Sequence, residues 1–350
     1  MKFTQERLFN FCKQFFETCG MSLDDAKLAA EVLVLADLRG IDSHGVARLS
    51  GYVRLANKGR ANLKAKPFIV HQTPSTATLD ANQGLGLIAA PMAMNIAIEK
   101  AKNVGTGWVA IKNSNHFGIA AYHAMMALPH DMIGISMTNA SPLVAPTNAK
   151  ERMLGTNPIC IAFPSGKEIP FVVDMATSNA ANGKLEIAQR LNKQVPIGWV
   201  QTKEGNESTN ANELKDGGAL LPLGGHKGYG LAAAVDILSA VLSGANYGPW
   251  VPPFVAFLDP LPNLPGEGIG HFVGAMRVDA FRPKEDFKAH MDNWIHRFKA
   301  AERIDTNTEV LIPGELEHRA HLQRAADGIE LNPQVQLDLE ALAAQLQLVL

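Results

Sequence analysis

The stretch "PICIAFPSGKEIPFVVDM", residues 158–175, decides which class of fold the chain can adopt. Its two ends, 158–163 and 170–175, are short apolar runs typical of strands, and the turn between them contains Gly166. Parallel strands need a crossover of about a dozen residues or more, so this short connection favours an antiparallel hairpin. We therefore expect an α/β protein whose central sheet is mixed.

The regions on either side of this hairpin supply the rest of the sheet. Alternating or continuous apolar runs predict further strands at 76–81, 108–112, 133–138 and 271–278. The segment 87–102 has helical periodicity, and its Pro91 is tolerable only in a first turn. Residues 245–270 are rich in Pro and Gly, which indicates a long surface loop.

Both ends of the chain are helical in pattern. Helices are expected at 4–19, from a Ser22 cap (with Asp25 as capping partner) to Gly40, from about Ser43 to about Asn57, and from an Asn332 cap and Pro333 onward. Because the two helical ends flank an α/β middle, we expect them to pack together as one discontinuous domain. The predicted division is 1–66 plus 283–350 for the helical domain and 67–282 for the α/β domain.

Composition narrows the possible partners. The chain has 350 residues, 47% of them hydrophobic and 19% charged, with a formal net charge of −2 and no basic block. This charge balance gives no support for nucleic-acid binding. The longest apolar helix, 230–244, is interrupted by Asp236 and falls short of the ~20 apolar residues of a membrane span. Three cysteines without a pattern suit a reducing compartment, so we expect a cytoplasmic protein.

A row of three functional side chains stands in "GIDSHGVARLSGYVRL", residues 40–55. His44, Arg48 and Tyr52 are four residues apart, so on an α-helix they would share one stripe. Asp42 or Ser43 could cap that helix, and its N-terminus would favour a bound anion. A guanidinium matches a carboxylate, and an imidazole exchanges protons near neutral pH. The row predicts a site for a small carboxylate with a reacting oxygen beside it; the alternative is a solvated helix face.

His116 is the second histidine of interest. It lies among small polar residues at a strand-to-helix junction, where functional groups are frequent, although it could simply cap the helix. With His123 and His130 it forms a series spaced by seven residues. Helical metal ligands are usually closer in sequence, as in H-E-x-x-H, and Pro129 should end the helix first. We therefore expect no metal site.

Two glycine-rich turns could approach a phosphate. Gly84-x-Gly86-x-x-Ala89 resembles a Rossmann phosphate turn, but the next strand ends in Lys112 rather than an acid. Close packing is the better explanation for those glycines. "LGGHKGYG", residues 223–230, places His226 and Lys227 where a glycine turn enters a helix. Open backbone N–H groups with a nearby lysine make a plausible pyrophosphate seat.

Five segments, "DSHGVARLSGY", "NSNHFG", "NASPLVAPTNAKERMLGTNP", "VDMATS" and "LGGHKGYG", resemble the malate/L-lactate dehydrogenase family, which is distinct from the Rossmann-type dehydrogenases. The resemblance covers residues 3 to about 345. It implies a non-Rossmann α/β/α core like that of L-sulfolactate dehydrogenase, and a homodimer with active sites near the subunit interface. It also implies NAD- or NADP-linked interconversion of a 2-hydroxy acid and a 2-keto acid.

The resemblance also assigns residues. His44 matches the proton donor of some members and His116 the acid/base of others, while Ser43 and Arg48 line the substrate. The positions matching the cofactor site are Ala140, Ser141, Asp174, Met175, Ala176, His226, Lys227, Gly314 and Glu315. Asn182 departs from the larger or basic residue of many relatives, so NAD and NADP both stay open.

The helical domain would then carry dimerisation and the substrate side, and the α/β domain the cofactor. "NASPLVAP" is most similar to members acting on malate or lactate. Other members reduce cyclic imino acids, ureidoglycolate, diketogulonate or sulfopyruvate, and these substrates remain alternatives. A non-catalytic protein that binds small anions is the competing class.

Overall fold

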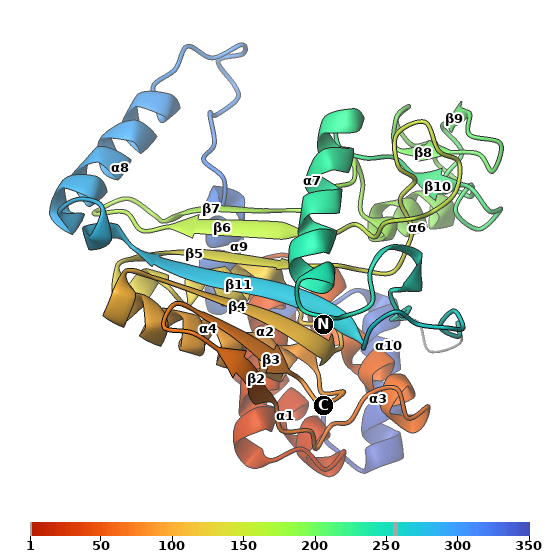
Figure 1. The fold of residues 1–350 in the computed structure, drawn as a ribbon. Helices are drawn as coiled ribbons and strands as arrows, with labels where there is room; N and C mark the ends of the chain where they lie inside the picture. The colour runs from red at the N-terminus through yellow and green to blue at the C-terminus, as the bar shows by residue number, and fades with distance from the viewer. Residues whose placement is uncertain (1, 255–257) are drawn as a thin grey trace.

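The computed structural model describes residues 2–254 and 258–350, and a seven-stranded sheet runs through its centre (Figure 1). The strand order is β2-β3-β4-β11-β5-β6-β7. The strands are β2 (Phe68–Gln72), β3 (Thr76–Asp80), β4 (Thr106–Ser114), β11 (Ile269–Arg277), β5 (Met132–Thr138), β6 (Ile159–Phe163) and β7 (Phe171–Met175). All six strands predicted from the sequence are present; β2 was not predicted.

The sheet is mixed, as the 158–175 hairpin predicted. β3 and β4 pair in parallel and every other neighbouring pair is antiparallel. In the β6–β7 hairpin Ile159 faces Met175 and Phe163 faces Phe171. This pattern brings the ends of β4, β5 and β7 to one edge of the sheet, together with the starts of β6 and β11.

Helices α4 (Gly86–Val104) and α5 (Ala120–Met125) cover one face of the sheet, and α7 (His226–Asp236) lies on the other (Figure 1). The backbones approach closely, since a Cβ at Gly107 or Gly134 would collide with carbonyl groups of α4 and α5. The turn before α4 is also tight: a Cβ at Gly86 would lie 2.5 Å from the Asn115 carbonyl oxygen. Close packing, and not a Rossmann turn, therefore explains these glycines.

The helices at the two chain ends share one apolar core. They are α1 (Gln5–Thr18), α2 (Leu23–Leu38), α3 (Leu49–Asn57) and α10 (Pro333–Leu346). Helix α9 (Glu315–Asp327) lies against α2, and the strands β1 (Lys2–Phe3) and β12 (Ile329–Glu330) pair with each other. Phe11, Phe15 and Phe16 of α1 are almost completely buried in the core that also contains Leu339 of α10. The predicted caps Ser22 and Asn332 both accept hydrogen bonds from their helices.

Helix α8 (Lys284–Lys299) stands apart, beside the β6–β7 hairpin (Figure 1). Trp294 packs edge-to-face against Phe171, and Asp292 accepts hydrogen bonds from the N–H groups of Gly166 and Lys167. The division of the chain into two domains stays a prediction.

Beyond β7 the chain forms a small sheet that was not predicted. Its strands are β8 (Val200–Gln201), β9 (Glu207–Ser208) and β10 (Ala219–Leu220), and α6 (Asn182–Arg190) precedes them. The predicted loop 245–270 contains a short turn at Gly248–Trp250, and its residues 255–257 lie outside the described residues. Over 2–254 and 258–350, no helix combines the length and apolarity that crossing a membrane requires.

Candidate active site

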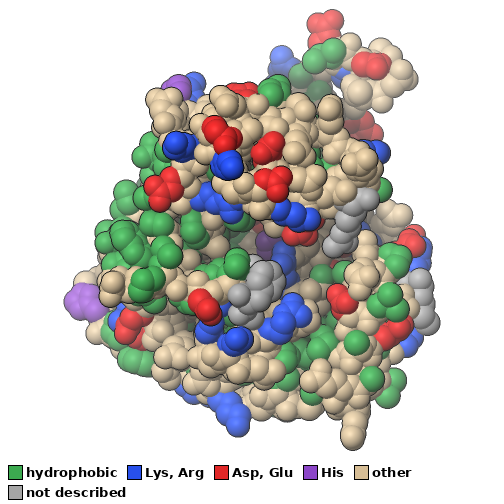
Figure 2. All heavy atoms as spheres, turned by 90° about the vertical axis from the view of Figure 1, so that its right-hand side faces the viewer, with side chains coloured by type: hydrophobic (Ala, Val, Ile, Leu, Met, Phe, Trp, Pro, Cys, Tyr) green, Lys and Arg blue, Asp and Glu red, His purple; other side chains and the backbone are tan. Residues whose placement is uncertain are grey.

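The histidine and arginine of the N-terminal row meet His116 at the edge of the sheet where β4, β5 and β7 end. Figure 2 looks onto this end of the molecule and shows a hollow with a histidine and basic side chains inside it. The His44 and His116 rings stack with centroids 5.5 Å apart. The two candidate acid/base groups are 72 residues apart in the sequence, yet they face one space.

The predicted single helix from Ser43 to Asn57 is wrong. Two short 3₁₀ turns, Asp42–His44 and Val46–Arg48, precede α3 and are separated at Gly45. The buried carboxylate of Asp37, on α2, accepts the Val46 N–H at 2.8 Å and removes it from any helical ladder. A Cβ at Gly45 would collide with that carboxylate, so only glycine fits there.

The side chains expected to cap that helix do something else. Ser43 Oγ lies 2.9 Å from His44 Nδ1, and Asp42 pairs with Arg324 of α9. Arg324 also donates to the Asp37 carbonyl oxygen at 2.5 Å. The 42–48 segment is thus held from two other helices.

Arg48 presents its guanidinium toward the histidines. Its Nε donates to the Ser43 carbonyl oxygen at 2.5 Å, which sets the side-chain direction. Its two terminal nitrogens make no hydrogen bond or salt bridge with any residue in the described ranges. A half-buried guanidinium with two open donors is suited to a bidentate carboxylate.

Tyr52 is fully buried and reaches the site through His116. Its exposed fraction is 0%, and its hydroxyl lies 2.8 Å from His116 Nδ1. This burial leaves no room for the direct substrate contact expected from the sequence. The Gly118 N–H also points at Nδ1, at 3.3 Å. Because this N–H can only donate, Nδ1 is the acceptor, and neutral His116 carries its proton on Nε2.

Phe254 covers the same space from the long loop. Its ring lies 4.9 Å from His116 and 5.4 Å from Tyr52, centroid to centroid, and Arg48 sits 5.6 Å above it. Its backbone N–H donates to Ser141 Oγ at 3.3 Å. Arg60 donates to the carbonyl oxygens of Pro253 and Leu258.

Burial and like charge keep both histidines neutral. Burial, followed by the charge of Arg48, lowers the pKa of His44 to about 4. Burial and then the neighbouring His44 and Arg48 lower the pKa of His116 well below its ordinary value. A carboxylate bound to Arg48 would offset the repulsion and raise both pKa values.

The positions on the sheet that are expected to bind the cofactor lie at the same edge. Ala140 and Ser141 follow β5, while Asp174 and Met175 end β7 and Ala176 follows. Asp174 accepts the Ala121 N–H at 2.9 Å, so it joins β7 to the helix that begins after His116. Burial raises the pKa of Asp174 to about 6.

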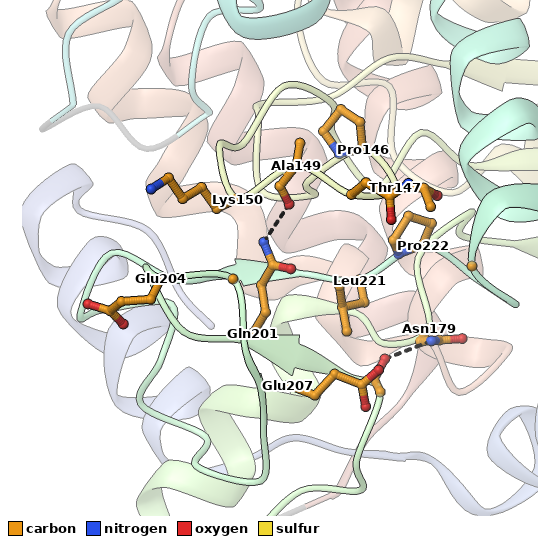
Figure 3. Close-up of a pocket in the computed structure, with 14 residues that line it drawn as sticks. Pro146, Thr147, Ala149, Lys150, Asn179, Gln201, Glu204, Glu207, Leu221 and Pro222 are labelled. Carbon is orange, nitrogen blue, oxygen red and sulfur yellow. Dashed lines mark hydrogen bonds between the residues drawn. The ribbon is translucent and has the colours of Figure 1, made fainter.

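The glycine turn before α7 has the properties of an anion seat. His226 and Lys227 are exposed in the first helical turn, and their backbone N–H groups donate to no described residue. Gly224 and Gly225 have positive φ, and no atom lies within 4 Å of a Cβ position at either. A cavity of about 530 Å³ opens beside Gly225, with Lys150, Glu204 and Glu207 around it (Figure 3).

The last two expected cofactor positions, Gly314 and Glu315, differ from each other. Gly314 has a φ of 92° and packs against Val172 of β7. Glu315 is 5% exposed, and its carboxylate is engaged by Lys299, Arg319 and the Ile312 N–H. Glu315 thus holds the start of α9, and its side chain is not open to a ligand.

These features fit a nicotinamide dinucleotide. The open glycine turn suits a pyrophosphate. The guanidinium of Arg39, beside Asp174, has a buried Nε without a partner.

Among the described residues no three His, Cys, Asp or Glu side chains are grouped as metal ligands, and His123 bonds to the Phe117 carbonyl oxygen.

Three residues of this region were missed from the sequence: Asp37, Arg39 and Phe254. Asp37 gave one signal, an acid directly after the apolar run 32–36. Arg39 and Phe254 gave none, because a cation at a helix end and an aromatic residue in a proline-rich loop are ordinary. Their importance comes from which distant segments they meet.

Comparison with known proteins identifies the family and the fold. The profile of the malate/L-lactate dehydrogenase family matches residues 3–340. Malate dehydrogenase of Pyrococcus horikoshii is 43% identical over 318 residues, 89% of this chain and 86% of that protein. L-sulfolactate dehydrogenase of Methanocaldococcus jannaschii is 40% identical over 329 residues, 94% of this chain and 92% of that protein. The solved structure of sulfolactate dehydrogenase from M. jannaschii superposes with a TM-score of 0.92, at 38% identity, and covers 99% of this chain and 98% of the other. With the expected non-Rossmann fold and family both confirmed, the chain belongs to the malate/L-lactate dehydrogenase family.

Proposed function

We propose that this protein interconverts malate, or a related small 2-hydroxy acid, and its 2-keto acid with NAD or NADP. One observation carries the proposal: the open guanidinium of Arg48 and two neutral imidazoles, His44 and His116, share one half-buried space. This set supplies a carboxylate grip and two groups for one reacting oxygen. The malate and sulfolactate dehydrogenases named above support this choice of substrate class.

Arg48 orients the substrate in this proposal. The Nε bond to the Ser43 carbonyl oxygen fixes one edge of the guanidinium and leaves its terminal nitrogens free for a substrate, while its charge acts on both imidazoles. A 2-keto acid gripped there would have its carbonyl oxygen close to its carboxylate, and therefore close to the histidines. The bound charge also raises the pKa of His44 and prepares it to hold a proton.

His44 is our candidate for the proton carrier. Bound nicotinamide supplies the hydride for reduction and accepts it in oxidation. His44 donates a proton to the substrate oxygen during reduction and removes it during oxidation. Its Nδ1 contacts the exposed hydroxyl of Ser43, which offers a path to solvent.

His116 has a different role in this proposal. The Gly118 N–H and the Tyr52 hydroxyl both lie at Nδ1, so the proton of neutral His116 resides on Nε2. Nε2–H can donate a hydrogen bond to the same substrate oxygen and stabilise the charge that develops there. Tyr52 acts through His116 as a positioning residue. The reverse assignment, with His116 as the acid/base, is the second candidate.

We also propose that the chain works as a homodimer in the cytoplasm. On α7 and its continuation, Ile237, Val241 and Leu242 are each more than half exposed, and such apolar surface is typical of an interface. Its three cysteines are free, as a reducing compartment would keep them. Light scattering coupled to size-exclusion chromatography tests the dimer.

The direct test is turnover by the purified protein. Oxidation of NADH and NADPH is followed with oxaloacetate, pyruvate, sulfopyruvate and a cyclic imino acid, and oxidation of ureidoglycolate is followed in the reverse direction. We expect the highest kcat/KM with oxaloacetate. A preference for the imino acid or for ureidoglycolate would reassign the substrate. Thermal stabilisation by these acids without any turnover would instead identify a binding protein.

A further inference from the structure

A fully buried histidine, His271 on β11, links two neighbouring strands behind the candidate active site. Its exposed fraction is 0%. Its Nδ1 lies 2.7 Å from Thr138 Oγ1, and its Nε2 lies 2.8 Å from Ser114 Oγ. Hydroxyl groups can donate or accept, so both ring nitrogens have a partner while the imidazole is neutral. The ring stays neutral, because burial lowers the pKa of His271 to about 3.

The two hydroxyls stand at the ends of the strands that lead into the candidate site. Ser114 is the last residue of β4 and precedes His116 by two residues. Thr138 is the last residue of β5, and the expected cofactor positions Ala140 and Ser141 follow it. Strand β11 lies between β4 and β5 in the sheet (Figure 1). One side chain of β11 therefore connects the segment of His116 to the segment 140–141.

The backbone pairing of β4 with β11 is irregular at this point. Ser114 pairs with Ile269 on β11. The next pair joins Ile111 and His271, so β4 carries one residue more than β11 between the two pairs. Asn113, inside this bulge, has a positive φ of 55°. Because ladder hydrogen bonds are locally disrupted at a bulge, the side-chain contact between His271 and Ser114 supports the point where the chain leaves β4.

Packing against His271 extends to the residue after His116. The Phe117 ring stacks on the His271 ring, with centroids 4.8 Å apart and an angle of 10° between the planes. The start of α4 closes this contact, since a Cβ at Gly86 would lie 2.8 Å from His271 Nε2 and 2.5 Å from Phe117 Cβ. His271 thus contacts the chain two residues before His116 and one residue after it.

The end of β5 is fixed to β11 by further hydrogen bonds. Thr138 Oγ1 lies 2.9 Å from the Gly270 carbonyl oxygen. Asn139 accepts the Gly270 N–H at 3.0 Å and donates to the Asp236 carboxylate at 2.9 Å. The ends of β5 and β11 are therefore held together, and the His271 ring extends this connection to β4.

We propose that His271 is a positioning residue of the reaction, which holds His116 at a fixed distance from the segment 140–141. The inference rests on the proposed function, in which the substrate oxygen lies at His116 while hydride passes between substrate and cofactor. The ring itself touches no substrate, because it is buried and both of its nitrogens have partners. A misplacement of about 1 Å can lower a reaction rate about 100-fold. A small shift of either strand end should therefore slow the reaction without removing any group that binds a ligand.

Ser114→Ala and Thr138→Val each remove one contact of the ring and leave the imidazole in place. Hydride transfer is measured in a single turnover by stopped flow, at saturating reduced cofactor and keto acid. Its rate should fall about 10- to 100-fold in each variant. KM for the keto acid and Kd for the cofactor should stay within about threefold of wild type, because the binding groups are unchanged.

The matched control is Thr106→Val. The Thr106 hydroxyl also joins β4 to β11, since it donates to the Ala275 carbonyl oxygen at 3.3 Å, but it stands at the opposite end of β4. The control should leave the hydride-transfer rate within about twofold of wild type.

The double variant Ser114→Ala/Thr138→Val shows whether both hydroxyls act through the same ring. Once one contact is lost, the link is broken, so the double variant should be about as slow as the slower single variant. Two independent structural losses would instead multiply. An unchanged hydride-transfer rate in either single variant, a multiplied loss in the double variant, or weaker ligand binding at an unchanged rate would overturn the inference.

Hydrogen exchange followed by mass spectrometry gives a reading that needs no turnover. Backbone amides of 115–118 should exchange faster in Ser114→Ala, and those of 139–141 faster in Thr138→Val, whereas Thr106→Val should match wild type at both segments. Unchanged exchange at both segments would overturn the inference. If wild type turns over none of the acids, the proposed function fails, and faster exchange would still show that the His271 link holds these two segments.

Discussion

Arg48→Lys is the most informative change in the candidate active site. The variant keeps a positive charge but loses the planar fork of the guanidinium. In the structure Nε is used by the Ser43 carbonyl oxygen, so only the terminal nitrogens are open to substrate. A lysine ammonium cannot make the Ser43 contact and a two-point carboxylate contact together. We expect weaker binding of the 2-keto acid with little change in cofactor affinity.

The size of the effect follows from the number of contacts. A hydrogen bond to a charged group contributes about 1.5–3 kcal/mol, and Arg48→Lys removes one such bond to the substrate. With about 1.4 kcal/mol for each factor of ten, KM for the keto acid should rise about 10- to 150-fold. kcat should fall less, because His44 and His116 stay in place once substrate is bound.

The assay is steady-state oxidation of reduced cofactor at varied keto acid and saturating cofactor, with cofactor Kd measured separately by titration. The matched control is Arg54→Lys, since Arg54 is an exposed arginine on α3, the helix that follows Arg48. The control should leave KM within about twofold of wild type. If Arg48→Lys weakens cofactor binding while KM for the keto acid is unchanged, Arg48 does not hold the substrate.

Three further changes test other parts of the site and its support. His44→Ala should lower kcat about 10²- to 10⁴-fold while cofactor Kd stays unchanged; a near-normal kcat would remove His44 from proton transfer. In the protein without substrate the pKa of His44 is about 4. Reduction needs protonated His44, so kcat/KM for reduction should fall about tenfold per pH unit above that value. Oxidation needs neutral His44, so kcat/KM for oxidation should be level at neutral pH. Tyr52→Phe removes one of two donors at His116 Nδ1 and should reduce kcat more than it raises KM, by about tenfold; an unchanged kcat would refute the positioning role. Burial raises the pKa of Asp37 to about 8, so the folded state binds this proton more tightly and stability is lost as pH rises from about 4 through about 8. Asp37→Asn should therefore raise Tm at pH 8 and change it little near pH 4, and a uniform drop in Tm at both would contradict this.

Much of the fold could be predicted because its signals are local. The hairpin at 158–175, the apolar strands and the helix caps at Ser22 and Asn332 each depend on residues within a few positions of one another. The small sheet of β8, β9 and β10 escaped prediction, because its two-residue strands are too short to show a period.

The sequence by itself determined the residue types of the site and six of the strands of the central sheet. It could not determine the shape of the 42–48 segment, because the break at Gly45 is imposed by Asp37 from another helix. Nor could it show that Phe254 lies against His116, or that Arg39 is buried without a partner. Those facts depend on contacts between segments far apart in the chain. Only the tertiary structure decides them, since burial and pairing are properties of the packed molecule and not of any stretch of sequence.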